Sequence, residues 1–159
     1  MIRQQVYDRH DDCIIFSKDE KELIAAAFKF RLDDIRKAIK DVNILLGRSK
    51  FEPKKALIQF YKSGLIFDLT SCGQRFLDVI EHDCIEVTGS TSGLIFFMKL
   101  KADIYRYMTE FAIGADFTHY KEEADNHYKI ATLMLKYWRQ KKMGNNPDDD
   151  KIDTLRLSL

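Results

Sequence analysis

The chain has 159 residues, of which 45% are hydrophobic and 32% are charged, a composition typical of a single globular domain. Its 26 basic and 25 acidic residues almost cancel, which gives no basis for a nucleic-acid-binding or membrane-surface role. No apolar run is long enough to span a bilayer, and the polar residues 2–4 do not resemble the start of a signal peptide. Cys13, Cys72 and Cys84 are odd in number and widely spaced, which argues against a disulfide framework. We therefore expect a protein of a reducing compartment, with the cytoplasm as the default.

Long helical segments separated by short breakers follow one another along the chain. Ser17 and Glu20 have the spacing of a capping box, and Pro53 suits the first turn of a later helix. The apolar run at 13–16 could be a strand, but it is too short to carry a sheet. We predict an all-α fold, an antiparallel array of long helices in a single domain covering 1–159. After a poorly assigned segment at 1–17, the expected helices are 18–46, 53–86, 94–113 (after a Gly/Ser/Thr loop, and ending at Gly114), 117–143, and the first turns of a further helix at 151–159.

The segment 94–113 carries the most informative polar pattern. Its Lys99, Asp103, Arg106 and Tyr107 are spaced i, i+4, i+7 and i+8, which places them on one side of a helix beside an apolar stripe. The pattern predicts a polar face with two cations, a carboxylate and a phenol.

The helix expected at 18–46 carries a matching set of cations. Lys29 and Arg36 are seven residues apart, which is about two turns and roughly 10 Å along one face, and Lys40 continues that face. A phosphorylated side chain needs forked arginine donors with a further lysine or tyrosine donor, and the two helices together could supply them. A charged stripe is more often only a solvated face, so spacing alone does not decide the function.

Two blocks of sequence resemble the 14-3-3 family. Residues 97–116, which read FMKLKADIYRYMTEFAIGAD, look like the family's fifth helix, whose usual text is close to F-Y-x-K-M-K-G-D-Y-x-R-Y-L-A-E-F-A-x-G-x-D. Residues 19–29, which read DEKELIAAAFK, are similar to N-E-E-R-N-L-L-S-V-A-Y-K in its third helix. The resemblance implies an adaptor in signalling that binds partner proteins at phosphoserine or phosphothreonine, with no catalytic residues, cofactor or metal.

Position by position, the resemblance assigns a phosphate cradle. The family's third-helix lysine and arginine match Lys29 and Arg36, and its fifth-helix arginine and tyrosine match Arg106 and Tyr107. These four residues are called the cradle below. By the same resemblance, residues that flank the peptide in the groove are Lys99, Asp103, Lys40, which replaces an arginine, and Leu159, which matches a leucine of the apolar wall.

The chain also departs from the family pattern. Asp33 and Asp34 bring two carboxylates near the cradle, where they could weaken phosphate binding or hold the arginines in place. The resemblance covers most of residues 17–159, stops one residue before the family's peptide-gripping asparagine, and lacks the last helices. The family's first two helices, which build its dimer, have no convincing match in 1–17, so a homodimer stays undecided.

Three other interpretations stay open on the residues. A helical scaffold of the tetratricopeptide kind would bind unmodified peptides, although its 34-residue signature is not visible. A degenerate 14-3-3-like module could bind partners without phosphate dependence. A helical enzyme domain would need converging titratable groups, and no set with catalytic or metal-ligand spacing is apparent.

Overall fold

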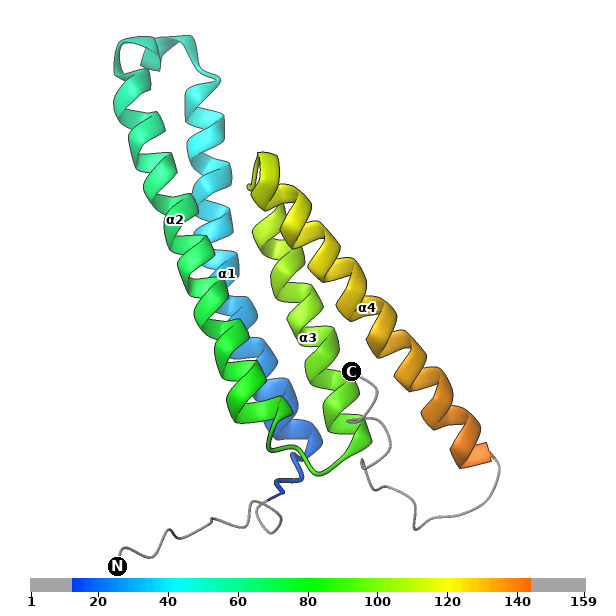
Figure 1. Ribbon diagram of the computed structural model, residues 1–159. Coiled ribbons are helices and arrows are strands. Elements are labelled where there is room, and N and C mark those ends of the chain that lie inside the picture. Colours follow the sequence, from blue (N-terminus) through cyan, green and yellow to red (C-terminus); the bar gives the residue numbers. More distant parts are fainter. Residues whose placement is uncertain (1–12, 144–159) are drawn as a thin grey trace, which may run out of the picture.

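A computed structural model describes residues 13–143 as an array of long helices (Figure 1). The all-α, antiparallel architecture predicted from the sequence is confirmed. The expected helix at 151–159, residue Leu159 and most of the segment 1–17 lie outside the described residues. The elements in chain order are α1 (Lys18–Leu46), η1 (a 3-10 helix, Ser49–Lys54), α2 (Lys55–Val79), η2 (a π-helix, Ile80–Ile85), α3 (Thr91–Thr109) and α4 (Gly114–Met143).

The four long helices alternate in direction, so that α1 and α3 run one way and α2 and α4 run the other (Figure 1). The hairpin of α1 and α2 packs beside the hairpin of α3 and α4, and α3 contacts all three other long helices. Because α3 is covered on several sides, most of its residues are buried. These include Leu94, Phe97, Met98, Leu100, Ala102, Asp103, Ile104, Tyr107 and Met108.

Helix α1 has the bounds expected from the sequence, and its start is the capping box. The Glu20 amide donates to the Ser17 Oγ at 3.2 Å, and the Ser17 amide donates to the Glu20 carboxylate at 2.7 Å. Two backbone donors that the first turn would leave unpaired are thereby satisfied. Three or four residues separate the buried side chains further along, which are Leu32, Ile35, Ile39 and Val42, and this spacing turns one face of α1 to the core.

The helix predicted at 53–86 is wrong in its bounds. Pro53 lies inside the short η1, and α2 begins two residues later at Lys55. At its other end α2 gives way at Ile80 to the wider π-helix, in which the Glu86 amide donates to the Glu81 carbonyl at 3.0 Å. No pattern in the sequence predicted the five-residue hydrogen-bond spacing of this segment.

The expected bounds of the last two described helices also shift. Helix α3 begins at Thr91, three residues early, because the Ser90 hydroxyl caps it by accepting from the Gly93 amide at 3.0 Å. It ends at Thr109, and Gly114 begins α4 instead of ending α3. Gly114 has a φ of 59°, a left-handed conformation that favours glycine at this reversal of the chain.

The apolar run at 13–16 makes one isolated parallel bridge, between Ile14 and Thr88. The Ile14 amide donates to the Val87 carbonyl, and the Gly89 amide donates to the Ile14 carbonyl, both at 2.8 Å. This pairing ties the start of the described chain to the turn before α3. Among residues 13–143 no helix is long and apolar enough to cross a membrane.

Candidate functional site

The parallel course of α1 and α3 brings two pairs of opposite charges together. Lys29 Nζ lies 3.0 Å from Asp103 Oδ2, and Arg36 Nε lies 2.5 Å from Glu110 Oε2. Both pairs are separated by 74 positions, because the two helices advance side by side at the same rise per residue. Residues two turns apart on α1 therefore meet residues two turns apart on α3.

At the Lys29 contact, Asp103 joins three helices. Its carboxylate lies 3.0 Å from the Lys29 ammonium of α1 and 3.2 Å from the Lys99 ammonium of its own helix, and it accepts a hydrogen bond from the Tyr128 hydroxyl of α4. Burial opposes ionisation, but the tyrosine hydrogen bond and the two ammonium groups outweigh it and lower the pKa of Asp103. The buried carboxylate is therefore ionised and fixes the position of Lys29.

Two turns further along α3, Glu110 likewise joins α3 to cations of α1. Its two carboxylate oxygens pair separately, one with Arg36 Nε at 2.5 Å and the other with Lys40 Nζ at 2.9 Å. Burial raises the pKa of Glu110, but Lys40 and Arg36 lower it by more, so the net shift is downward. Arg36 also donates from Nη1 to Asp33 Oδ1, one turn earlier on α1.

The ring of Tyr107 brings the two arginines of the cradle together. The Arg36 Cζ lies 4.3 Å from the ring centroid and the Arg106 Cζ lies 4.7 Å from it, both within cation–π range. Partial burial lowers the pKa of Arg106, but its interactions with Tyr128, Tyr107 and Asp103 raise it by more, so the net shift is upward and the guanidinium keeps its charge. Two forked donors and a phenol thus share one small region.

An open pocket of about 410 Å³ adjoins these arginines. Among residues 13–143, Arg106 has no carboxylate within ion-pair distance, whereas Lys29, Lys40 and Lys99 each have one and Arg36 has two. Helices α1, α3 and α4 all contribute to its lining, which consists of Arg36, Arg106, Thr109, Glu110, Phe117, Lys121, Ala124, Asp125 and Tyr128.

Taken together, the group has an excess of positive charge. Five cations (Lys29, Arg36, Lys40, Lys99 and Arg106) face three carboxylates (Asp33, Asp103 and Glu110), which leaves a net charge of +2. A phosphoryl group carries about −1.5 to −2 charge at neutral pH. The group therefore has the charge and the forked donors to bind a phosphate.

The sequence-predicted polar face of α3 needs a correction. Asp103 and Tyr107 are buried, and only Lys99 and Arg106 are exposed, because α1 and α4 cover this side of α3. Lys40 lies beside Arg36 through their shared carboxylate, and Leu159 lies outside the described residues.

Two residues that sequence reasoning missed complete the arrangement. Glu110 lies one turn after Arg106, and that i, i+4 position was a usable signal for a carboxylate on the same face. Tyr128 lies on α4, and no spacing within the chain connects it to Asp103, so only the packed structure identifies it.

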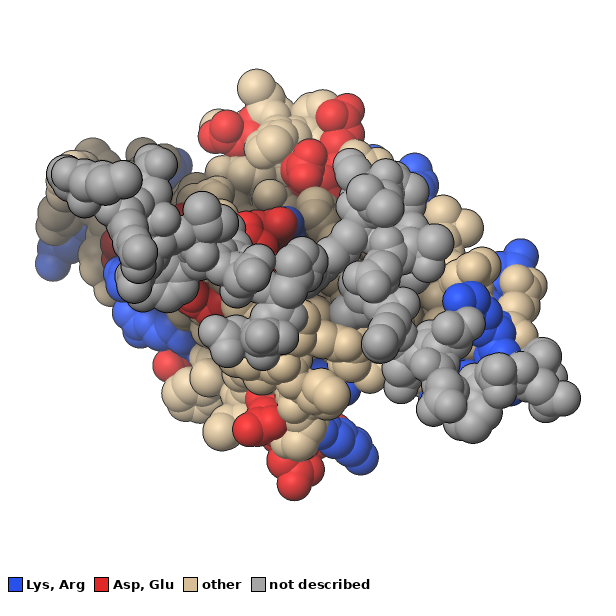
Figure 2. Space-filling view, turned by 60° about the horizontal axis from the view of Figure 1, so that its bottom comes forward, with Lys and Arg blue, Asp and Glu red and all other residues tan. Residues whose placement is uncertain are grey.

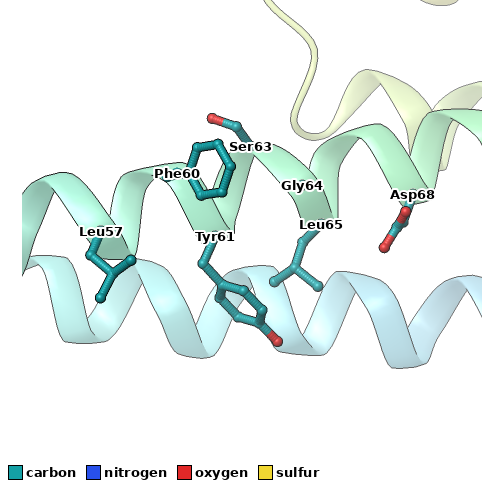
Figure 3. A pocket seen from close by; sticks show the side chains of 7 residues that line it. All are labelled: Leu57, Phe60, Tyr61, Ser63, Gly64, Leu65 and Asp68. Carbon is teal, nitrogen blue, oxygen red and sulfur yellow. The ribbon is translucent and has the colours of Figure 1, made fainter.

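A hollow on α2 has a different chemistry. A pocket of about 450 Å³ on α2 is mainly apolar, with Leu57, Phe60, Tyr61 and Leu65 beside the single charged residue Asp68 (Figure 3). It has no cation to receive an anion. The end of the molecule at which α1 begins shows charges of both signs interspersed on its visible face (Figure 2). Within residues 13–143, no group of three or more His, Cys, Asp or Glu side chains could hold a metal ion.

Residues 13–143 thus form an all-α helical array in which basic side chains gather around Tyr107 and Glu110, where the parallel helices α1 and α3 meet. Comparison with known proteins then gives the family, because the 14-3-3 protein model matches residues 8–144. The chain belongs to the 14-3-3 family.

Individual relatives are distant and longer than this chain. It is 27% identical over 116 residues to a 14-3-3-like protein of Fucus vesiculosus, covering 73% of this chain and 46% of that protein. It is 26% identical over 116 residues to 14-3-3 protein 10 of Solanum lycopersicum, with 71% and 46% covered. It is 27% identical over 117 residues to the checkpoint signal transducer rad24 of Schizosaccharomyces pombe, with 72% and 43% covered. The chain thus spans less than half the length of these relatives.

Proposed function

We propose that the cradle binds a phosphoserine or phosphothreonine side chain of a partner protein, and that the chain acts as a signalling adaptor and not as an enzyme. The observation that carries the proposal is the approach of Arg36 and Arg106 to the same Tyr107 ring, within a group of net charge +2. Forked guanidinium donors match phosphate oxygens better than a lysine ammonium can.

We expect an incoming phosphate to contact Arg106 first. This arginine is exposed at the edge of the pocket, it has no carboxylate partner among residues 13–143, and its guanidinium lies over the ring of Tyr107. Lys29 is held against Asp103 two turns earlier along the same pair of helices, so its ammonium is already in place before a ligand binds. A ligand phosphate would meet donors that are already ordered, which reduces the entropic cost of binding.

The second candidate is a module that binds partners without phosphate dependence. The observation that favours it is the ion pairing of four of the five cations with the protein's own carboxylates. A phosphate would have to share or displace these partners. The two candidates differ in one measurable property, which is the ratio of affinities for a phosphorylated and an unphosphorylated segment.

Substitution of Arg106 tests the proposal. A labelled phosphoserine peptide and its serine twin are titrated against the 159-residue chain by fluorescence anisotropy. Because hydrogen bonds to charged groups contribute about 1.5–3 kcal/mol, Arg106→Ala should weaken phosphopeptide binding by roughly tenfold to a hundredfold. Arg75→Ala, which removes an exposed arginine of α2, is the matched control and should leave affinity unchanged. Equal affinity of wild type and Arg106→Ala for the phosphopeptide would refute the proposal.

A further inference from the structure

The guanidinium of Arg36 is occupied on both of its forked edges. Glu110 Oε2 accepts from Nε at 2.5 Å, on the edge that Nε shares with one terminal nitrogen. Asp33 Oδ1 accepts from Nη1, on the edge formed by the two terminal nitrogens. A bidentate phosphate contact needs one complete edge. Neither edge of Arg36 is therefore open while both carboxylates remain in place.

The two carboxylates differ in what their release would disturb. Glu110 belongs to α3 and also pairs with Lys40, so its removal would break two contacts between helices. Asp33 lies one turn before Arg36 on the same helix, and its side chain is 56% exposed. Among residues 13–143 its only ion-pair partner is Arg36. Asp33 can therefore turn into solvent without disturbing the packing of α1 against α3.

We infer that Asp33 is an internal competitor of the phosphate ligand and sets the affinity of the cradle. Its carboxylate occupies the terminal edge of Arg36, and a phosphoryl group must displace it to bind there. This inference rests on the proposed function of the site. A phosphate can displace the carboxylate because it carries more charge and three acceptor oxygens, whereas an uncharged serine segment cannot. Asp33 thereby makes the affinity-determining contact of Arg36 conditional on a strong anion.

The sign of one substitution separates this role from a structural one. If Asp33 only held Arg36 in position, Asp33→Asn would loosen the guanidinium and weaken phosphopeptide binding. If Asp33 competes with the ligand, the same substitution strengthens binding. The adjacent Asp34 supplies a matched control, because it is also exposed and has no ion pair among the described residues. Asp34→Asn changes the net charge equally and leaves Arg36 occupied.

The experiment titrates the phosphoserine peptide and its serine twin against the full wild-type chain and both asparagine variants. An exposed ion pair contributes about 0.2–1 kcal/mol, and removing repulsion of the phosphate adds to it, so we expect Asp33→Asn to bind the phosphopeptide about threefold to tenfold more tightly. Asp34→Asn should change affinity less than twofold, and urea unfolding should show that Asp33→Asn is no more stable than wild type.

Two results would overturn the inference, and they are distinguishable from failure of the proposed function. If Asp33→Asn bound the phosphopeptide no more tightly than Asp34→Asn, or more weakly than wild type, Asp33 would not be a competitor. The proposed function would still stand as long as wild type preferred the phosphopeptide over its serine twin. If neither wild type nor Asp33→Asn preferred the phosphopeptide over its twin, both the competitor role and the proposed function would fall.

Discussion

Substitution of Asp103 should reveal how much the contact between α1, α3 and α4 stabilises the fold. Asp103→Asn removes the buried charge that holds Lys29 and Lys99 but keeps an acceptor for the Tyr128 hydroxyl. Removal of one partner from a fully buried ion pair costs about 3–5 kcal/mol. Here the side chain of Lys99 is 61% exposed and that of Lys29 is 36% exposed, so both ammonium groups can return to water. We therefore expect a smaller loss of about 1–2 kcal/mol in the free energy of unfolding, which corresponds to a Tm lower by about 2–8 °C.

The pH dependence of this loss supplies an internal check. Because the folded state lowers the pKa of Asp103 from its ordinary value of 3.8, the carboxylate stabilises the fold above that value. The stabilisation is lost as the pH falls through the lowered pKa of the folded state. The difference between wild type and Asp103→Asn should be complete at pH 7 and should shrink below about pH 4.

Urea unfolding followed by circular dichroism at pH 7 and pH 3 measures both quantities. Asp34→Asn removes an exposed carboxylate and serves as the control, with an expected change below about 0.5 kcal/mol. The reasoning would be refuted if Asp103→Asn matched that control at pH 7, or if its deficit were equally large at both pH values.

Two further outcomes follow from packing and burial. A Cβ at Gly73 would lie 2.5 Å from the Met108 Sδ, so Gly73→Ala should destabilise the chain by about 1–3 kcal/mol. Gly64→Ala, whose Cβ would have no atom within 4 Å, should stabilise it by up to about 1 kcal/mol. Urea unfolding compares the two variants, and a Gly73→Ala variant as stable as wild type would contradict the tight contact. Burial raises the pKa of Cys84 to about 11, so iodoacetamide at pH 8 should alkylate the exposed Cys13 first and Cys84 only after unfolding. Mass spectrometry of the digested protein shows which cysteine is labelled, and early labelling of Cys84 would count against its burial.

The sequence predicted those features of the fold that depend on local pattern. The capping box at Ser17 and the apolar spacing set α1, and both are readable without a structure. The bounds of the later helices were harder to predict from the sequence, because the Ser90 cap and the π-helix after Val79 depend on competing local hydrogen bonds. The pattern of apolar and polar residues does not show which of these competing hydrogen bonds forms.

The cations of the candidate site and the carboxylates of Asp33 and Asp103 were named from the sequence, whereas Glu110 and Tyr128 were missed. Lys29 and Arg36 stood out because of their spacing and their match to the 14-3-3 pattern. Glu110 and Tyr128 acquire a role only because α1, α3 and α4 pack in one register, and that register is a tertiary property. Asp33 was noticed as a departure from the family, but its partner could not be chosen before the position of Arg36 was known.

We propose that a phosphoryl group binds between Arg36 and Arg106. NMR of the arginine Nε–H resonances during a titration with the phosphoserine peptide and its serine twin tests it directly. We expect the resonances of both arginines to shift in saturable fashion with the phosphopeptide and to stay in place with the serine twin. Unmoved arginine resonances at saturating phosphopeptide, or equal shifts with both peptides, would contradict it.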